Sequence, residues 1–184
     1  MKIIDCDFFV VGSGIAGLMS ALKLSKTGKV VVVTKKDRAD SNTNYAQGGI
    51  ACVVAEDDSF EQHVKDTIDA GAGLCNEDVV RTIVAEGPKQ IAELEKLGVR
   101  FSSDISAQSG TRYDLGREGG HSKRRVLHAG DITGRHVEQI LLQNVQERNS
   151  IVLLEHSMLV DLITTGWLGL AGENRCVGAY VLDR

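Results

Sequence analysis

Three glycines near the start of the chain constrain its fold more than any other feature. Gly12, Gly14 and Gly17 form the pattern GxGxxG directly after a short apolar run, Phe8 to Val11, which predicts a buried strand. The segment that follows predicts a helix, because apolar residues recur in it at helical spacing: Ile15, Leu18, Met19 and Leu22.

We expect this helix to end at Gly28, a residue type that commonly caps helix C-termini. Val30 to Val33 is then a continuous β-branched run, which is typical of a central parallel strand covered on both faces. The order strand, helix, strand predicts a βαβ unit with a right-handed crossover. In that setting GxGxxG indicates a dinucleotide-binding fold.

Each glycine of the pattern has a separate expected role. Gly12 permits the tight turn, Gly14 lets a pyrophosphate approach the backbone, and Gly17 lets helix and strand pack closely. The free amides of residues 13 to 16 and the helix dipole would hold the pyrophosphate. The expected pyrophosphate-binding residues are therefore Gly12, Ser13, Gly14, Ile15 and Ala16. The alternative is a loop whose glycines serve packing alone.

The end of the second strand leaves the cofactor undecided. A dinucleotide fold often places an acid there to bind a ribose, but this strand ends in Thr34, Lys35 and Lys36, and Asp37 lies beyond that point. By spacing alone a lysine would suit the 2′-phosphate of NADP. Plain solvent exposure of the two lysines is the other interpretation.

Downstream, the chain is polar from Lys35 to Ala55, which predicts a loop with a short strand at Ile50 to Val54. Three helices should follow, one beginning at Ser59, one capped by Asn76, and one from Pro88 to Gly98. The first should open with a capping box formed with Gln62. Their expected buried faces are Phe60, Val64 and Ile68 in the first, and Val79, Val80, Ile83 and Val84 in the second.

The stretch from Ser102 to Asp131 lacks periodicity, and a long irregular stretch in a compact domain is usually functional. A helix from Gly134 to Glu147 should follow. The expected last strands are Ile151 to Leu154, Met158 to Thr164 and Cys176 to Leu182, the last two as an antiparallel hairpin. The buried face expected for the helix is Val137, Ile140, Leu141 and Val145.

Composition excludes several classes of protein. The 184 residues suffice for one domain, and a net charge of −4 argues against a nucleic-acid-binding surface. The four cysteines form no CxxC pair, so neither a zinc site nor a disulfide framework is expected, nor any other metal. No stretch approaches the ~20 apolar residues of a membrane helix. Asp5 and Asp7 interrupt the first apolar run, so we expect no signal peptide and a cytoplasmic protein.

The segment Ser41 to Ala51, SNTNYAQGGIA, resembles the second flavin-binding segment of the succinate dehydrogenase, fumarate reductase and aspartate oxidase family. The resemblance implies FAD, with Lys35 beside its adenosine end. It implies an α/β, Rossmann-like FAD-binding domain with a parallel sheet, a helical insertion and an antiparallel hairpin. The residues that it places along the flavin are Asn42, Thr43, Asn44, Tyr45, Ala46, Gln47, Gly48 and Gly49.

Asn42 departs from part of that family. Succinate dehydrogenases and many fumarate reductases carry there a histidine that bonds covalently to the flavin, and asparagine cannot form this bond. The resemblance therefore implies noncovalent FAD, as in aspartate oxidases. The run REGGHSKRRVLHA, Arg117 to Ala129, followed by Asp131 to Arg135, resembles the aspartate oxidase signature much more than the dehydrogenase one.

The resemblance to aspartate oxidases implies oxidation of L-aspartate to iminoaspartate, by hydride transfer from Cα to the flavin, with oxygen or fumarate as acceptor. The product would feed quinolinate and NAD synthesis, with a hand-off to quinolinate synthase. Glu118 is the expected substrate contact, because a carboxylate near the ammonium group favours aspartate over succinate. Alternatively, Glu118 pairs with Arg117 or Arg124. The remaining basic residues of the run, His121, His128, Arg124 and Arg125, would add positive potential or serve as structural hydrogen-bonding groups.

In this interpretation residues 1–184 are the N-terminal part of an FAD-binding domain. Its capping domain and second flavin-binding half are absent, and the piece alone is inactive. Three alternatives remain: a fumarate reductase or succinate dehydrogenase flavoprotein, a non-catalytic FAD-binding fragment, and an NADP-dependent Rossmann enzyme.

Overall fold

The computed structural model describes residues 2–103 and 112–183, and these form two compact units. The first comprises Met1–Asn44 and Leu141–Arg184, and the second comprises Tyr45–Ile140. Within the described part of the chain, no helix combines the length and the apolar character needed to cross a membrane. The predicted irregular stretch includes residues 104–111, which lie outside the described residues.

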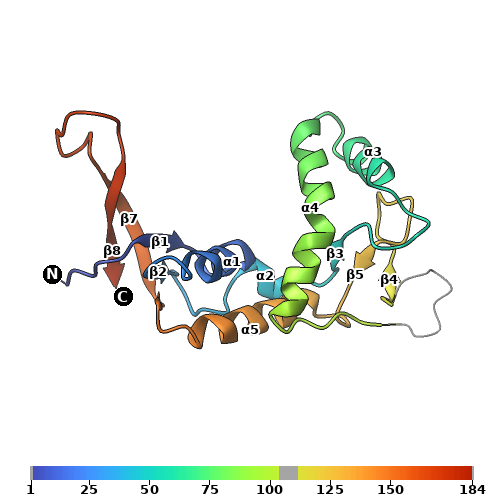
Figure 1. Cartoon of the computed structure of the whole chain (residues 1–184), viewed down its shortest axis with the longest axis horizontal. Coiled ribbons are helices and arrows are strands. Elements are labelled where there is room, and N and C mark those ends of the chain that lie inside the picture. The colour runs from blue at the N-terminus through green and yellow to red at the C-terminus, as the bar shows by residue number, and fades with distance from the viewer. Residues whose placement is uncertain (1, 104–111, 184) are drawn as a thin grey trace. The chain divides into compact units, whose positions relative to one another are not determined.

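The first unit contains the predicted βαβ unit. Strands β1 (Phe8–Val11), β2 (Val30–Val33) and β6 (Ile151–Leu154) form a parallel sheet in the order β1-β2-β6. Helix α1 (Ile15–Leu24) connects β1 to β2 along the chain (Figure 1). All four valines of β2 are buried, as expected for a central strand. The core is formed by Ala21, Val30 and Val32, with Phe8, Val10, Leu24, Ile151 and Leu153 packed against it.

The C-terminal hairpin is confirmed: β7 (Ser157–Thr164) pairs antiparallel with β8 (Cys176–Asp183). The prediction for Gly28 is wrong. Helix α1 ends at Leu24 with Ser25 as its C-cap, and Gly28 lies beyond it. A Cβ on Gly28 would lie 2.7 Å from a carboxylate oxygen of Asp7. Glycine is needed there because Asp7 packs against it while accepting a hydrogen bond from the Lys29 amide.

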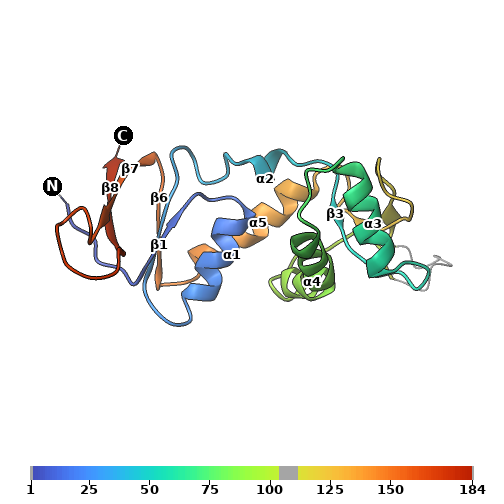
Figure 2. The same ribbon diagram turned by 90° about the horizontal axis from the view of Figure 1, so that it is seen from above.

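The second unit contains α3 (Phe60–Ala70) and α4 (Glu77–Lys96) (Figure 2), and a small antiparallel sheet in the order β3-β5-β4 (Figure 1). Its strands are β3 (Ile50–Ala51), β4 (Leu115–Gly116) and β5 (Val126–Leu127). Strand β3 is shorter than predicted. The other two strands lie in the stretch expected to be irregular.

Helix α3 begins as predicted, since the Ser59 hydroxyl accepts a hydrogen bond from the Gln62 amide. The reciprocal half of the predicted capping box is wrong. The Gln62 side chain donates to Asp66 instead, and the Ser59 amide donates to Asp58. Of the predicted buried face, Val64 is buried, whereas Phe60 is exposed.

The two helices predicted on either side of Pro88 are one helix, α4, with the proline inside it. Asn76 caps its start as predicted, accepting a hydrogen bond from the Val79 amide. The buried residues of α4 are Val84, Ile91 and Leu94, on both sides of the proline, whereas Val79 and Ile83 of the predicted face are exposed. Packing of this continuous apolar face outweighs the hydrogen bond that the proline removes.

Helix α5 (Thr133–Gln146) matches the predicted helix, and of its expected apolar face Val137, Leu141 and Val145 are buried. It begins in the second unit and ends in the first. A one-turn helix that the sequence did not predict, α2 (Asn42–Tyr45), lies in the loop after β2.

Candidate functional site

The glycine turn between β1 and α1 has a geometry that side chains would disrupt. Gly12 has a φ of +102°, in the region that favours glycine, and its amide donates to the Val33 carbonyl at 2.8 Å. Gly14 is the N-cap of α1 with extended backbone. A Cβ on Gly17 would lie 2.0 Å from the Gly12 carbonyl oxygen. Gly17 thus allows the helix to lie directly against the turn.

The N-terminus of α1 presents backbone donors beside this turn. Among the described residues, no hydrogen bond occupies the amides of Gly14 and Ala16. The expectation of a free amide at Ile15 is wrong, because that amide donates to the Thr43 hydroxyl at 3.0 Å. Ser13 has a structural contact as well, since its buried hydroxyl donates to Thr34 at 3.1 Å. Two amides and the positive end of the helix dipole fit an anionic diphosphate.

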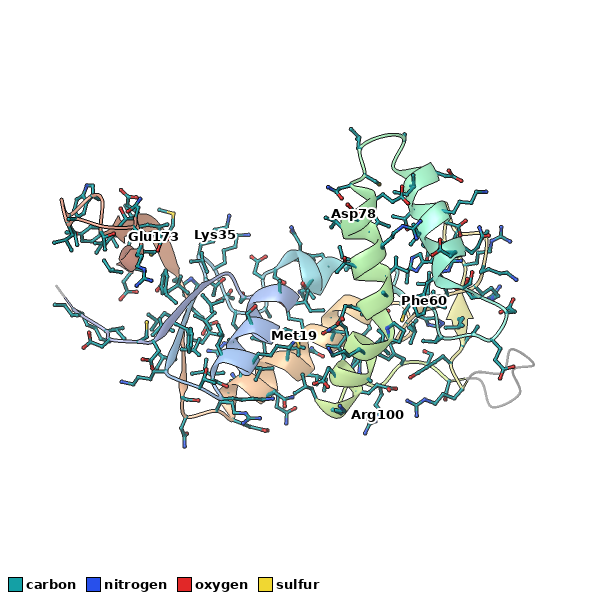
Figure 3. The ribbon with its side chains drawn as sticks, turned by 45° about the horizontal axis from the view of Figure 1, so that its top comes forward. Met19, Lys35, Phe60, Asp78, Arg100 and Glu173 are labelled. Atoms are coloured by element: carbon teal, nitrogen blue, oxygen red, sulfur yellow. The ribbon has the colours of Figure 1, made fainter. Side chains whose placement is uncertain are left out.

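The loop after β2 distinguishes the two lysines at its start. Both lysines are exposed, but Lys36 pairs with Asp40 at 2.8 Å, whereas Lys35 forms no ion pair among the described residues (Figure 3). Arg38 forms an ion pair with Glu155, which follows β6, and its amide also donates to that carboxylate at 2.7 Å. The contacts of Arg38 fix the loop to the end of β6, and Lys35 is the lysine of the two whose charge has no ionic partner among the described residues.

The predicted flavin segment begins in α2. The Ser41 hydroxyl accepts a hydrogen bond from the Thr43 amide at 3.1 Å, which starts the single turn. Asn42 and Tyr45 are exposed, whereas Thr43 and Asn44 are partly buried. Thr43 is the residue whose hydroxyl contacts the N-terminus of α1, so the start of this segment and the glycine turn are joined within the first unit.

In the second unit, the start of α5 holds residues 46 to 48. The Gly134 amide donates to the Ala46 carbonyl at 2.9 Å, and the Thr133 hydroxyl lies 3.3 Å from the Gly48 carbonyl. These carbonyls therefore face α5. The amides of Gln47 and Gly48 carry no hydrogen bond among the described residues, so they are available to a ligand.

Gly49 is required by the neighbouring strand. A Cβ at this position would lie 2.3 Å from the Leu127 carbonyl oxygen and 2.7 Å from Cγ1 of Val126. Only glycine lets the segment approach β5 this closely.

Glu118 lies beside this segment. Its Oε1 atom is 3.7 Å from the position of a Cβ on Gly48. Both residues line a cavity of about 370 Å³. The residues lining it are Gln47, Gly48, Gly116, Glu118, Val126, His128, Gly130 and Asp131. Of the predicted residues in this unit, the structure thus brings Gln47, Gly48 and Glu118 together.

The alternative partners of Glu118 are engaged elsewhere. Arg117 donates to the His121 carbonyl at 2.9 Å, and Arg124 donates to the Leu115 carbonyl at 2.8 Å. Within the described part of the chain, Glu118 forms no ion pair. An exposed carboxylate at a cavity wall can bind a cationic group of a ligand.

Arg125 is fully buried and lies away from this cavity. Its guanidinium donates to Asp58 at 2.7 Å and to Asp66 at 2.6 Å, and lies 3.2 Å from Nδ1 of His121. The structural interpretation of Arg125 therefore holds. Burial alone would raise the pKa of Asp66, but hydrogen bonds from Ser122 and Arg125 hold it well below its usual value.

Thr133, Asp58 and Asp66 support the site and were not recognised in the sequence. Thr133 belongs to the run Asp131 to Arg135, and that motif was the available signal. The two aspartates are eight positions apart in a segment that suggested only a helix start. Their partner, Arg125, is more than fifty residues away in the chain.

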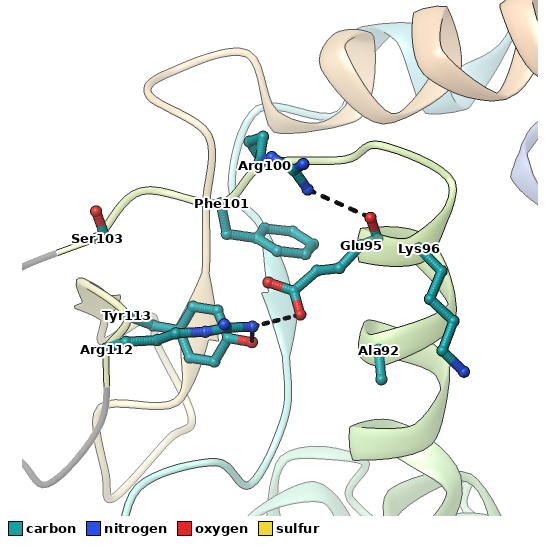
Figure 4. Close-up of a pocket in the computed structure, with 8 residues that line it drawn as sticks. All are labelled: Ala92, Glu95, Lys96, Arg100, Phe101, Ser103, Arg112 and Tyr113. Carbon is teal, nitrogen blue, oxygen red and sulfur yellow. Dashed lines mark hydrogen bonds and ion pairs between the residues drawn. The ribbon is translucent and has the colours of Figure 1, made fainter.

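A second cavity, of about 660 Å³, lies beside the end of α4 (Figure 4). In this cavity Arg112 donates hydrogen bonds to Glu95, at 2.6 Å, and to the Tyr113 hydroxyl, at 2.9 Å. Phe101 and Arg100 form another part of the cavity wall. None of the predicted site residues lines it.

Comparisons with known proteins agree with a flavin-nucleotide site. The L-aspartate oxidase of Yersinia pestis is 46% identical over 178 residues, covering 97% of this chain and 33% of its own length. The chloroplastic L-aspartate oxidase of rice, Oryza sativa subsp. japonica, is 46% identical over 177 residues, covering 96% of this chain and 26% of its own length. The chain thus spans about a quarter to a third of the length of these relatives.

Solved structures show the same fold. Quinol fumarate reductase FrdA of E. coli superposes with a TM-score of 0.80 at 31% identity, covering 89% of this chain and 28% of that one. Mycobacterium smegmatis Sdh1 superposes with a TM-score of 0.83 at 25% identity, covering 98% and 31% respectively. The family model described as "FAD binding domain" matches residues 7–184. The chain therefore belongs to the FAD binding domain family.

Proposed function

We propose that this chain is the N-terminal, FAD-binding part of an enzyme that oxidises L-aspartate to iminoaspartate. The observation that carries the proposal is the 46% identity to proteins named L-aspartate oxidase over nearly the whole chain. The fumarate reductase that shares the fold is 31% identical. Asn42, which cannot form a covalent bond to a flavin, supports noncovalent FAD and the oxidase over the dehydrogenase.

The residues present fit FAD. The open amides of Gly14 and Ala16 suit its pyrophosphate, and exposed Lys35 suits its adenosine end. In residues 42 to 49, the open amides of Gln47 and Gly48 would donate to the oxidised and reduced ring system. When bound, FAD supplies the redox chemistry by accepting a hydride from the substrate Cα.

Glu118 gives the site its preference for an amino acid. Aspartate carries an ammonium group that succinate lacks, and a charge-assisted hydrogen bond to that group favours aspartate. The carboxylate has no ionic partner among the described residues and lines the cavity beside Gly48, so it is available for this contact. His128 lies on the same cavity wall.

The same proposal extends to the surrounding pathway. In this proposal oxygen or fumarate would serve as the electron acceptor, and the product would pass to quinolinate synthase for NAD synthesis. The substrate's carboxylates are held by the capping domain and later segments that the proposal assigns to the complete enzyme. The bacterial relative's name gives no compartment and the rice relative's is chloroplastic. The cytoplasmic location stays a prediction.

The test is to express the complete gene product that contains this chain and to add L-aspartate without oxygen. The yellow colour of oxidised flavin should bleach with aspartate and persist with succinate. Bleaching by succinate instead would refute the proposal and favour the dehydrogenase.

The role of Glu118 is tested by Glu118→Gln, which should retain FAD and weaken aspartate turnover. Glu56→Gln is the matched control, because Glu56 is exposed and does not line the cavity. Equal aspartate kinetics in both variants would remove Glu118 from the mechanism.

A further inference from the structure

Glu118 lies on a loop rather than on a helix or strand. β4 ends at Gly116 and β5 begins at Val126. The Arg125 amide donates to the Gly116 carbonyl at 3.1 Å, which closes the base of the connection. We call residues 117–122 the Glu118 loop. Because a substrate-binding carboxylate must be held within a fraction of an ångström, contacts from outside this hairpin have to fix the loop.

Asp66 of α3 supplies such contacts. Its Oδ2 atom accepts the Ser122 amide at 2.8 Å, the Ser122 hydroxyl at 2.7 Å and the Arg125 guanidinium at 2.6 Å. Gln62 donates to the other oxygen at 2.8 Å. Asp66 is 8% exposed. This buried carboxylate therefore binds one end of the Glu118 loop with charge-assisted hydrogen bonds, which are the stronger kind.

The contacts continue from Ser122 to Glu118 through His121. The His121 amide donates to the Glu118 carbonyl at 3.3 Å, and the His121 carbonyl accepts a hydrogen bond from Arg117 at 2.9 Å. Its ring nitrogen Nδ1 lies 3.2 Å from the Arg125 guanidinium. The turn that carries Glu118 is thus held between its own backbone and the Asp66–Arg125 pair.

We propose that Asp66 is a positioning residue that sets selectivity for aspartate by holding the Glu118 loop. The inference rests on the proposed function, because it needs Glu118 to bind the substrate ammonium. Asp66 does not line the cavity, so it acts through the loop rather than on the substrate.

This role predicts a selective defect. A displaced Glu118 loop weakens binding of a dicarboxylate that carries an ammonium group. It leaves binding of succinate, which has no such group, unchanged. A general loss of structure would weaken both. Succinate inhibition therefore separates positioning from folding.

Two variants of the complete gene product test the inference. Asp66→Asn keeps the size of the side chain but removes its charge, and Ser122→Ala removes only the hydroxyl bond without leaving a buried charge unpaired. Asp69→Asn is the matched control on the same helix, because the exposed side chain of Asp69 has one ion pair among the described residues, with exposed Lys65 at 4.0 Å. Each protein is assayed for FAD content, aspartate KM and kcat, and the succinate inhibition constant.

We expect Asp66→Asn to raise the aspartate KM about tenfold, as for loss of hydrogen bonds to a charged group. Ser122→Ala should have the smaller effect, about threefold, because the Ser122 amide still donates to Asp66. Both should retain FAD and bind succinate like the unaltered protein. In the Glu118→Gln background, Asp66→Asn should have little additional effect, because the group that it positions is gone.

Aspartate turnover by the unaltered protein would uphold the proposed function. Given that turnover, three results would still overturn the inference about Asp66. These are normal aspartate KM in Ser122→Ala, parallel loss of succinate binding in both variants, and full additivity with Glu118→Gln. If Asp66→Asn does not fold, Ser122→Ala decides alone. If the unaltered protein fails to oxidise aspartate, the proposed function itself is refuted.

Discussion

Replacing Gly17 with alanine should destabilise the glycine turn through a clash between two backbones. The added Cβ would lie 2.0 Å from the Gly12 oxygen and 3.0 Å from its carbonyl carbon. Such atoms make contact at ~3.5 Å. Neither side can move easily, because the Gly12 amide is bonded to Val33 of β2 and α1 is fixed by fully buried Leu18 and Ala21.

The expected magnitude follows from two opposing effects. Overpacking of a rigid site costs about 3 kcal/mol or more, at the upper end of the usual range. Alanine returns about 1 kcal/mol through its higher helix propensity. Gly17→Ala should therefore lower the free energy of unfolding by about 2 kcal/mol or more. In urea this corresponds to a midpoint about 1 M lower.

Gly14→Ala is the informative comparison, because a Cβ there would lie 3.4 Å from the Thr43 hydroxyl, an ordinary contact. It should leave apoprotein stability nearly unchanged while weakening FAD binding, since the methyl group would occupy space near the open amides. Stability is measured by urea denaturation of the apoprotein, and affinity by quenching of flavin fluorescence. An unchanged urea midpoint for Gly17→Ala would refute the packing argument.

Three further predictions concern the rest of the chain. Burial lowers the pKa of His63, so the folded state binds a proton there less readily than the unfolded state, and the free energy of unfolding should fall as the pH drops below ~6.5. His63→Phe should reduce this loss of stability, measured by denaturation at about pH 7.5 and about pH 5.5. An unaltered pH dependence in the variant would contradict the prediction. Burial raises the pKa of Cys52 to about 11, so iodoacetamide should alkylate exposed Cys176 well before Cys52, as followed by mass spectrometry. Equal alkylation rates at the two cysteines would show that Cys52 is accessible. Pro88→Ala should raise the free energy of unfolding by about 1 kcal/mol or more by restoring a hydrogen bond to Val84; a decrease would show that α4 depends on the proline.

The first unit was predictable because its signals are local. The GxGxxG pattern, the helical spacing after it and the four valines of β2 each depend on neighbours in the sequence, and together they define the βαβ unit. The C-terminal hairpin was equally visible. Gly28 was misread because its neighbour Asp7 is distant in sequence, and a helix cap was the only local explanation of a glycine there.

The second unit was less predictable because tertiary contacts outweigh its local signals. Pro88 reads as a helix start, yet Val84, Ile91 and Leu94 bury one continuous face across it. Gly87 has a similar explanation, since a Cβ on it would lie 3.2 Å from the Cys52 sulfur. Gly87 and Pro88, two residues that disfavour a helix interior, are tolerated because α4 packs against the rest of its unit.

The proposed site likewise contains parts that local sequence signals predict and parts that depend on long-range contacts. Its cofactor segments were recognisable as motifs, whereas the contacts that hold them were not. Asp66 belongs to no motif, and neither Arg125 nor Thr133, which lie in recognised motifs, had a partner that the sequence could identify. Their partners are fixed only when α3, β5 and the start of α5 are folded together in one unit.

Gly17 in the first unit and Gly49 in the second meet the same steric constraint, each within its own unit. Gly17 and Gly49 each lack a Cβ that would collide with a carbonyl oxygen, at 2.0 Å and 2.3 Å. Each therefore permits a close backbone approach, and open amides lie within three residues of each, at Gly14 and Ala16 and at Gln47 and Gly48. A backbone packed this closely cannot shift to pair its amides elsewhere. The unused donors are thus kept in place for a ligand, which is the arrangement that rigid binding of a dinucleotide requires.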